Sequence, residues 1–245
     1  TRCNTAANCC RVPGRSLPSA GQKPRPSERQ KLSNGDATVK LYHSATSPYA
    51  RKVMIVAHET GQAGDIEIIP SAPHPIDRDS AIVSHNPLGK VPTLITPEGL
   101  VLFDSRVIAE YLAARSGDQR IFPAAGTGRW QALAWQALGD GLLDAALLIR
   151  YEATARPAEL RWALWQERQF DKIRSALAAI DAAAPAFDTA LDIGTITLAC
   201  ALLYLDLRFN ELDWRSEHPH AAAWFATIEN HESIRLTGAE APVPA

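Results

Sequence analysis

VKLYH (39–43), followed after three residues by SPYARKV (47–53), reads as a strand that leads directly into a helix. Ser47 suits the cap of this helix, because a serine side chain accepts a hydrogen bond from a free N–H of the first turn. Pro48 suits the first helical position, where no N–H is needed, and Gly61 provides a left-handed stop. The spacing of three and four predicts one apolar face, formed by Tyr49, Val53, Val56 and Ala57.

Ser47 admits two interpretations at this strand–helix junction. In the first, the serine is only a helix cap. In the second, its hydroxyl and the neighbouring free N–H groups form an anion site at the positive end of the helix dipole. The rest of the chain has to decide between them.

The segment up to about residue 116 continues to alternate strand and helix signals. A turn at 97–99 favours a hairpin between the two strands around it, and a helix capped at Asp104 or Ser105 ends before Gly117. The order βαβ, loop, ββα predicts a small mixed sheet covered by helices. The further strand-like segments are IEII (66–69), TLIT (93–96) and LVLF (100–103), and the loop is SHNPLGKVP (84–92).

The second half of the chain shows helical periodicity and no strand signal. It predicts an all-helical bundle with a buried helix near 191–209, and Thr189 to Asp192 has the form of a capping box for that helix. No internal repeat relates the two halves. The expected helices cover about 130–148, 160–180, 191–209, 219–228 and 233–236.

Composition excludes several functional classes. With 245 residues, 46% of them hydrophobic, the chain can build large cores. Its formal net charge of -2 creates no electrostatic field that would attract nucleic acid or an acidic membrane. We therefore expect no nucleic-acid and no membrane partner. The apolar run 193–205 is too short to span a bilayer and reads as a buried helix.

The cysteines and histidines indicate a reduced compartment, hence the cytoplasm, and no metal site. The cysteines are not spread as a disulfide framework would be, and no histidine follows them at a ligand spacing. The histidines show no HExxH pattern and read as surface or capping residues. The residues are Cys3, Cys9, Cys10 and Cys200, and His43, His58, His74, His85, His218, His220 and His231.

We expect four parts along the chain. Residues 1–36 are rich in Arg, Lys, Pro, Ser and Gly and predict a disordered extension. Since the chain starts at Thr1 and its only methionine is Met54, we expect this end to be a fragment boundary, a processed end or a remnant of cloning. Residues 37–117 form the α/β domain, 118–128 a linker, and 129–245 the helical domain.

Four motifs in order resemble the glutathione transferases, across about residues 39–236. They are LYHSATSPYARKV (41–53), NPLGKVPTL (86–94), LFDSRVIAEYL (102–112) and TALDIGTITLACALLYLDLRF (189–209). The chain is most similar to small bacterial members and to the serine-type, tau-like and omega-like branches. The resemblance implies a thioredoxin-like N-terminal domain joined to an all-α C-terminal bundle, a homodimer, and glutathione as co-substrate with no other cofactor.

The resemblance also implies roles for particular residues. Ser47 falls where tau-like members keep a catalytic serine and omega-like members a cysteine. Val91 and Pro92 match the dipeptide whose proline is cis, and Lys90 matches a basic residue near the glutathione carboxylates. Asp104 and Ser105 match the acidic-Ser pair that holds the γ-glutamyl end.

Physical chemistry is consistent with these roles. A hydroxyl at a helix N-terminus lowers the pKa of a bound thiol, so Ser47 would stabilise the glutathione thiolate rather than act as a nucleophile. An extended peptide can pair with the backbone of Val91 as an added strand. Ser105 suits a carboxylate and Asp104 the γ-glutamyl ammonium. The alternatives are an ordinary edge-strand proline at Pro92 and simple capping by Asp104 and Ser105.

The second-substrate pocket is harder to place from sequence. Tyr49, Arg150 and Tyr151 are candidates for its wall, and the alternative for the latter two is a solvated helix end. A glutathione transferase is the leading hypothesis. Two others stay open: a glutathione-dependent reductase or peroxidase, which usually needs a cysteine in place of Ser47, and a non-catalytic interaction protein on the same fold.

Overall fold

The computed structural model of the chain describes residues 38–238. The predicted extension 1–36 lies outside these residues. Four strands form one sheet in the order β2-β1-β3-β4. They are β1 (Val39–His43), β2 (Ile66–Pro70), β3 (Thr93–Ile95) and β4 (Val101–Leu102).

The sheet is mixed, as the sequence predicts. Strand β1 pairs in parallel with β2, Val39 opposite Ile66, and antiparallel with β3, Leu41 opposite Leu94. Strand β3 continues antiparallel to β4, which confirms the predicted hairpin. The parallel pair needs a crossover, and helix α1 (Pro48–Glu59) provides it.

Three helices accompany the strands. Helix α1 starts behind the Ser47 cap, and α3 (Ser105–Ser116) starts behind Asp104 and ends at Gly117 with a φ of 73°. The four-residue helix α2 (Ser80–Val83) lies just before the predicted loop 84–92, where the sequence analysis assigns no element, because one turn is too short to show periodicity.

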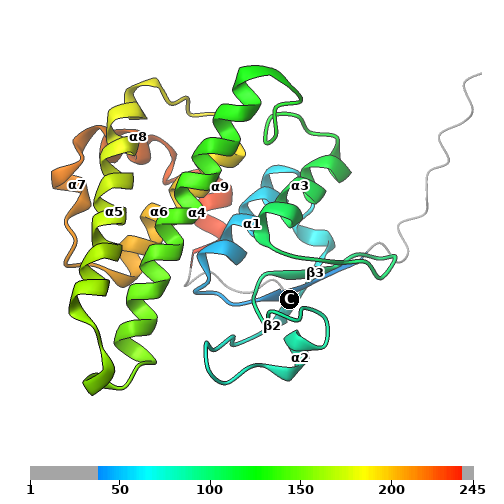
Figure 1. Cartoon of the computed structure of the whole chain (residues 1–245). Helices are drawn as coiled ribbons and strands as arrows, with labels where there is room; N and C mark the ends of the chain where they lie inside the picture. The colour runs from blue at the N-terminus through cyan, green and yellow to red at the C-terminus, as the bar shows by residue number, and fades with distance from the viewer. Residues whose placement is uncertain (1–37, 239–245) are drawn as a thin grey trace, which may run out of the picture. The chain divides into compact units, whose positions relative to one another are not determined.

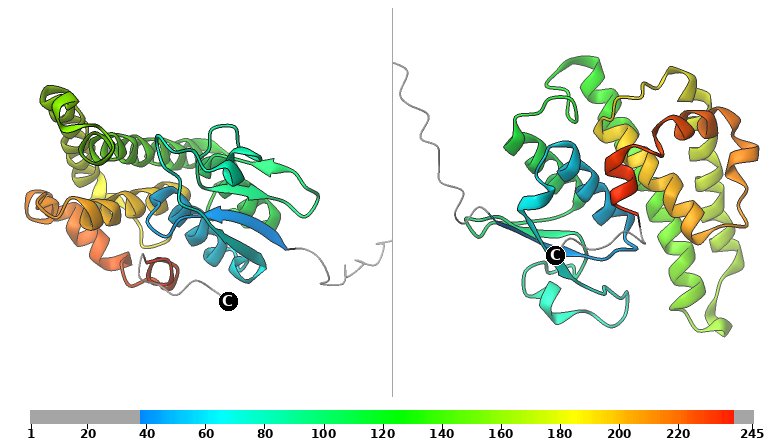
Figure 2. Two further views of the ribbon diagram at one scale, coloured as in Figure 1. Left: turned by 90° about the horizontal axis from the view of Figure 1, so that it is seen from below. Right: turned by 180° about the vertical axis from the view of Figure 1, so that it is seen from behind.

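After α3, all the regular secondary structure of the described chain is helical. In both views of Figure 2 they gather beside the sheet and its helices α1 and α3. The first, α4, begins inside the segment 118–128 predicted as a linker; the domain boundaries themselves stay a prediction. The helices are α4 (Gly126–Thr154), α5 (Ala163–Ala183), α6 (Ile193–Arg208), α7 (Trp214–Glu217), α8 (Pro219–Ile228) and α9 (Glu232–Leu236).

Helix α6 is the buried core helix, as predicted, but its cap differs from the prediction. The capping box is formed by Asp192 and Thr195: the Asp192 carboxylate accepts from the Thr195 N–H at 2.8 Å, and the Thr195 hydroxyl accepts from the Asp192 N–H at 2.9 Å. The box predicted to begin at Thr189 is therefore wrong. Asp192 is as good a cap as a threonine, and the helix begins one turn later.

Close approach of α4 and α6 depends on two glycines. A Cβ at Gly139 would lie 2.9 Å from the Thr197 methyl group, and one at Gly194 would lie 2.7 Å from the Ala132 carbonyl oxygen. The two helices therefore run side by side in the same direction (Figure 1). Helix α1 packs against both α3 and α6, so one continuous hydrophobic core joins the sheet side to the helical side.

Helix α4 is long and apolar enough, by length and composition alone, to cross a membrane. Half of its most apolar 18-residue window is buried within the structure, and the helix packs against α5 and α6. A core helix meets the same test of length and composition.

Candidate functional site

The first turn of α1 presents a hydroxyl beyond the end of β1. Ser47 has an extended backbone, and its Oγ accepts a hydrogen bond from the Ala50 N–H at 3.2 Å. The serine therefore caps the helix, as predicted. Within residues 38–238 its hydroxyl proton has no acceptor, so the half-buried Ser47 can still donate a hydrogen bond to a ligand.

The loop before β3 presents an unpaired peptide unit. The Val91–Pro92 bond is cis, as the resemblance implies. In the described part of the chain, neither the N–H nor the C=O of Val91 has a hydrogen-bond partner. Such a unit next to a strand is where an extended peptide adds to a sheet.

Asn86 holds this loop in place, although the sequence analysis did not single it out. Its side chain is buried and donates to the Thr93 hydroxyl at 2.9 Å and to the Lys90 carbonyl at 3.2 Å. The Thr93 hydroxyl in turn donates to the Lys90 carbonyl at 2.8 Å. These bonds fix the backbone on both sides of Val91. The dipeptide Asn86-Pro87 indicates a turn, but not these contacts.

The start of α3 presents a carboxylate and a second hydroxyl. Asp104 caps α3, since its Oδ1 accepts from the Arg106 N–H at 2.9 Å, and it also binds the Arg106 guanidinium at 2.8 Å. Partial burial raises the pKa of Asp104, but Arg106 outweighs this and holds that pKa below its usual value. Ser105 is buried, and its hydroxyl has no hydrogen-bond partner among residues 38–238.

Two contacts tie α1 to α4 beneath this surface. The Lys52 ammonium is fully buried and binds both oxygens of Asp140, at 2.7 and 3.0 Å. Burial raises the pKa of Asp140, and the Lys52 charge opposes that rise. The Tyr49 hydroxyl donates to the Asp144 carboxylate, and burial and this bond raise the Tyr49 pKa. These contacts set the position of the helix that carries Ser47.

All the site residues predicted from the sequence line one pocket of about 650 Å³. This volume is in the range of small-ligand sites. The wall also includes residues that the sequence analysis did not single out. The predicted residues are Ser47, Tyr49, Lys90, Val91, Pro92, Asp104, Ser105, Arg150 and Tyr151, and the additional ones include Asn86, Arg106, Asp140, Asp144, Tyr204 and Arg208.

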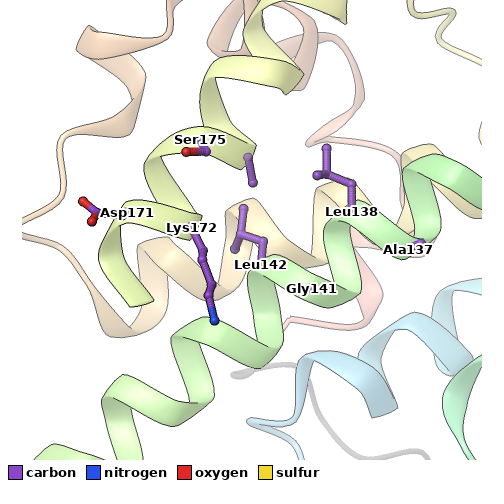
Figure 3. Close-up of a pocket in the computed structure, with 8 residues that line it drawn as sticks. Ala137, Leu138, Gly141, Leu142, Asp171, Lys172 and Ser175 are labelled. Carbon is purple, nitrogen blue, oxygen red and sulfur yellow. The ribbon is translucent and has the colours of Figure 1, made fainter. Parts of the chain in front are cut away.

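A second pocket, of about 470 Å³, lies between α4 and α5 (Figure 3). Figure 3 shows Leu138 and Leu142 of α4 facing α5, with Lys172 extending from α5 toward α4. None of the predicted site residues belongs to it. The candidate site is therefore the larger pocket at the N-termini of α1 and α3.

Other reactive groups lie away from this pocket wall or do not cluster. Cys200 is fully buried in α6, and burial raises the pKa of its thiol to about 11. Across the described range 38–238, no group of three or more His, Cys, Asp or Glu side chains is placed to hold a metal ion. The pocket wall carries hydroxyl groups, arginines and the carboxylates of Asp104, Asp140 and Asp144.

Comparison with known proteins places the chain in a family. Residues 46–115 match the glutathione S-transferase N-terminal domain and residues 163–227 the glutathione S-transferase C-terminal domain. The uncharacterized GST-like protein YibF of Escherichia coli K12 is 32% identical over 203 residues, which cover 81% of this chain and 98% of that protein.

Solved structures agree with the sequence comparisons. A glutathione transferase family member from Pseudomonas fluorescens Pf-5 with bound glutathione is 42% identical, with a TM-score of 0.80, over 84% of this chain and all of that one. A structure from the same organism with bound S-(propanoic acid)-glutathione is 41% identical, with a TM-score of 0.76 and the same coverage. The chain belongs to the glutathione S-transferase family.

Proposed function

We propose that the protein is a glutathione transferase that uses Ser47 to stabilise the glutathione thiolate. The observation that carries this proposal is the pocket itself. It brings the Ser47 hydroxyl, the unpaired Val91 peptide unit and the start of α3 to one cavity. Relatives of this chain have been solved with glutathione bound.

Glutathione fits these groups in one direction. Its cysteine unit pairs with the N–H and C=O of Val91 as an added strand, which directs the sulfur toward Ser47. Its γ-glutamyl carboxylate meets the Ser105 hydroxyl and the N–H groups at the start of α3. Its glycine carboxylate lies on the side of Lys90, an exposed residue of the pocket rim.

Asp104 receives the γ-glutamyl ammonium in this arrangement, although it already binds Arg106. A carboxylate has about four acceptor positions, so it can accept both donors. The Arg106 Nε also lies 3.8 Å from Asp140, which gives the guanidinium a second anionic neighbour when the ammonium arrives. Arg106 thus keeps Asp104 ionised and oriented before glutathione binds.

The proposed reaction is conjugation. The Ser47 hydroxyl donates to the sulfur at the positive end of α1, which lowers the pKa of the bound thiol and releases its proton to solvent. The thiolate then attacks an electrophilic carbon, a C–S bond forms, and the leaving group departs with its electron pair. A relative solved with S-(propanoic acid)-glutathione carries a carbon substituent on the same sulfur, which supports this chemistry.

Two alternatives make different predictions. A glutathione-dependent reductase or peroxidase needs a reactive thiol, and Cys200 is buried with a raised thiol pKa. An interaction protein on this fold would not bind glutathione. A calorimetric titration with glutathione, followed by a screen of aryl halides, epoxides, peroxides and mixed disulfides, separates the three; conjugation with an aryl halide or epoxide supports the proposal.

We also propose a homodimer, in which the sheet domain of one subunit faces α4 of the other. Three apolar side chains on these surfaces are exposed: Leu100 by 59%, Val107 by 47% and Trp130 of α4 by 68%. An interface would remove them from water. Light scattering at micromolar concentration should give twice the chain mass, and a monomer mass would contradict the proposal.

A further inference from the structure

The pocket has a second end, away from Ser47, where α4 and α6 finish side by side. Arg150 lies in the last turn but one of α4, and Arg208 is the last residue of α6. Both line the pocket and both are partly buried. We call Arg150 and Arg208 the arginine pair.

Helix geometry explains why the two arginines lie at the same end of the pocket. Helices α4 and α6 pack closely at Gly139, where an added Cβ would lie 2.9 Å from the Thr197 methyl group. Arg150 follows Gly139 by eleven residues, and Arg208 follows Thr197 by eleven residues. Eleven residues are about three turns, so each arginine lies on the same face of its helix as that contact and about 16 Å further along. The arginine pair is therefore held at one level on adjacent helices.

The environment of Tyr204 confirms this proximity. The tyrosine lies one turn before Arg208, on the same face of α6, and is buried. Burial raises the pKa of its phenol, and the positive charges of Arg150 and Arg208 both oppose that rise. Both guanidinium groups are therefore near the same hydroxyl.

The arginine pair has no anionic partner among residues 38–238, whereas Arg156 and Arg215 each have one. Arg156 binds Glu152 at 2.6 Å, and Arg215 binds Asp206 at 2.5 Å. The Nε of Arg208 is buried and, within the part of the chain that the structure describes, has no hydrogen-bond partner. Two like charges side by side, one with a buried unsatisfied donor, are unfavourable unless an anion joins them.

The carboxylates of the pocket do not supply that anion. Asp140 binds Lys52, Asp144 accepts from Tyr49, and Asp104 binds Arg106. Arginines at helix C-termini also offset the negative end of the helix dipole. That structural role does not require two of them at one level in a pocket, and it leaves the Arg208 Nε unsatisfied.

We propose that the arginine pair binds a carboxylate of the second substrate, so that the protein acts on small electrophiles that carry a negative charge. Guanidinium groups bind carboxylates through paired, charge-assisted hydrogen bonds. This inference rests on the proposed function, since it concerns what reacts with the glutathione held at Ser47. It specifies the substrate class that the fold alone leaves open.

The distance along α4 limits the size of the substrate. Asp144, which binds Tyr49 beside Ser47, precedes Arg150 by six residues, or about 9 Å along the helix axis. A chloroaryl carboxylate spans part of this length, and the arginine side chains reach the rest. In that reaction the sulfur bonds to the ring carbon, chloride leaves with the bonding pair, and the carboxylate stays unchanged on the arginine pair.

Binding of two matched conjugates tests the proposal without turnover. S-(4-carboxybenzyl)glutathione carries the charge, and S-(4-carbamoylbenzyl)glutathione has nearly the same shape without it. We expect the wild type to bind the charged conjugate at least about tenfold more tightly by calorimetry, the size of one charge-assisted hydrogen bond. Equal affinities in the wild type would overturn the proposal.

Variants test whether the arginine pair causes the preference for the charged conjugate. In the double variant Arg150→Gln/Arg208→Gln the preference, measured as the ratio of the two affinities, should fall to within about twofold. Arg168→Gln removes an exposed arginine of α5 that is outside the pocket and should keep the full preference. A preference that persists in the double variant would place the carboxylate elsewhere and refute the role of the arginine pair.

Two further measurements distinguish a failure of this inference from misfolding of the variant and from a failure of the proposed function. The wild-type preference should shrink as salt rises, since it is electrostatic, and this needs no variant. Wild type should also convert 4-chloro-3,5-dinitrobenzoate at a higher kcat/KM than its carboxamide. If glutathione and both conjugates fail to bind, the proposed function fails with the inference; if glutathione binds and both conjugates bind equally, only the inference fails.

Discussion

Replacing Ser47 by alanine separates its two roles, because the structure assigns a different consequence to each. The substitution removes the Oγ that accepts from the Ala50 N–H at 3.2 Å. Loss of a cap costs about 0.5–2 kcal/mol. We expect a value near the lower end, because the bond is long and Pro48 at the first helical position remains.

The catalytic effect should be larger than the effect on stability. The hydroxyl proton of Ser47 has no acceptor within the described range, so the hydroxyl is free to donate a hydrogen bond to the ligand. One charge-assisted hydrogen bond is worth about 1.5–3 kcal/mol. We therefore expect kcat/KM of Ser47→Ala to fall roughly tenfold to a hundredfold for an aryl halide, while glutathione still binds through Val91 and Ser105.

The pH dependence of the rate shows whether the Ser47→Ala substitution raises the pKa of the bound thiol. Without its donor the bound thiol should have a higher pKa, by about one to two units for a loss of that size. The rate deficit should then be greatest near pH 6.5 and smaller near pH 8.5, where an ordinary thiol ionises unaided. A deficit that is the same at both pH values would contradict thiolate stabilisation.

Two controls complete this experiment. Ser47→Thr keeps a hydroxyl at the cap and should recover much of the rate. Asp213→Ala removes the cap of α7, outside the pocket, and should lower stability without changing kcat/KM. The reasoning is refuted if Ser47→Ala, like Asp213→Ala, changes only the free energy of unfolding.

Three more predictions concern packing and binding. Asp140→Asn leaves the buried Lys52 ammonium without its counter-ion and should lower the free energy of unfolding in urea by about 3–5 kcal/mol. The double variant Lys52→Met/Asp140→Leu should lose much less, and equal losses in the two variants would refute the argument. Gly194→Ala places a Cβ 2.7 Å from an α4 backbone oxygen and should destabilise by about 1–3 kcal/mol, while Gly141→Ala, in open space on α4, should be neutral or stabilising. Ser105→Ala should weaken glutathione binding by about tenfold with little change in Tm, and unchanged affinity would remove Ser105 from the site.

Local signals in the sequence predict much of this fold. The Ser47 and Asp104 caps, the stop at Gly117 and the hairpin around 97–99 depend on neighbouring residues, and the structure has all of them. Composition identifies the buried helix, but the capping-box pattern places its cap one turn too early. Thr189 and Asp192 are both good caps, and only the packed structure shows which one begins the helix.

The site is predictable only in part. The motifs point to Ser47 and Val91, but Asn86 and Arg208 could not be found in this way. Asn86 acts through bonds that exist only once the loop is folded. Arg208 lies at the same level as Arg150 because α4 and α6 pack closely at Gly139, and a contact between helices far apart in the sequence leaves no periodic signal in either helix.

The measurement that tests the central claim most directly is calorimetry of glutathione binding at pH 7 in two buffers that differ in ionisation enthalpy. A free thiol is mostly protonated at this pH, so binding as a thiolate must release a proton. The account predicts saturable binding, one site per chain, with close to one proton released for glutathione and none for S-methylglutathione. Absence of saturable binding, or binding with no proton release, would contradict it.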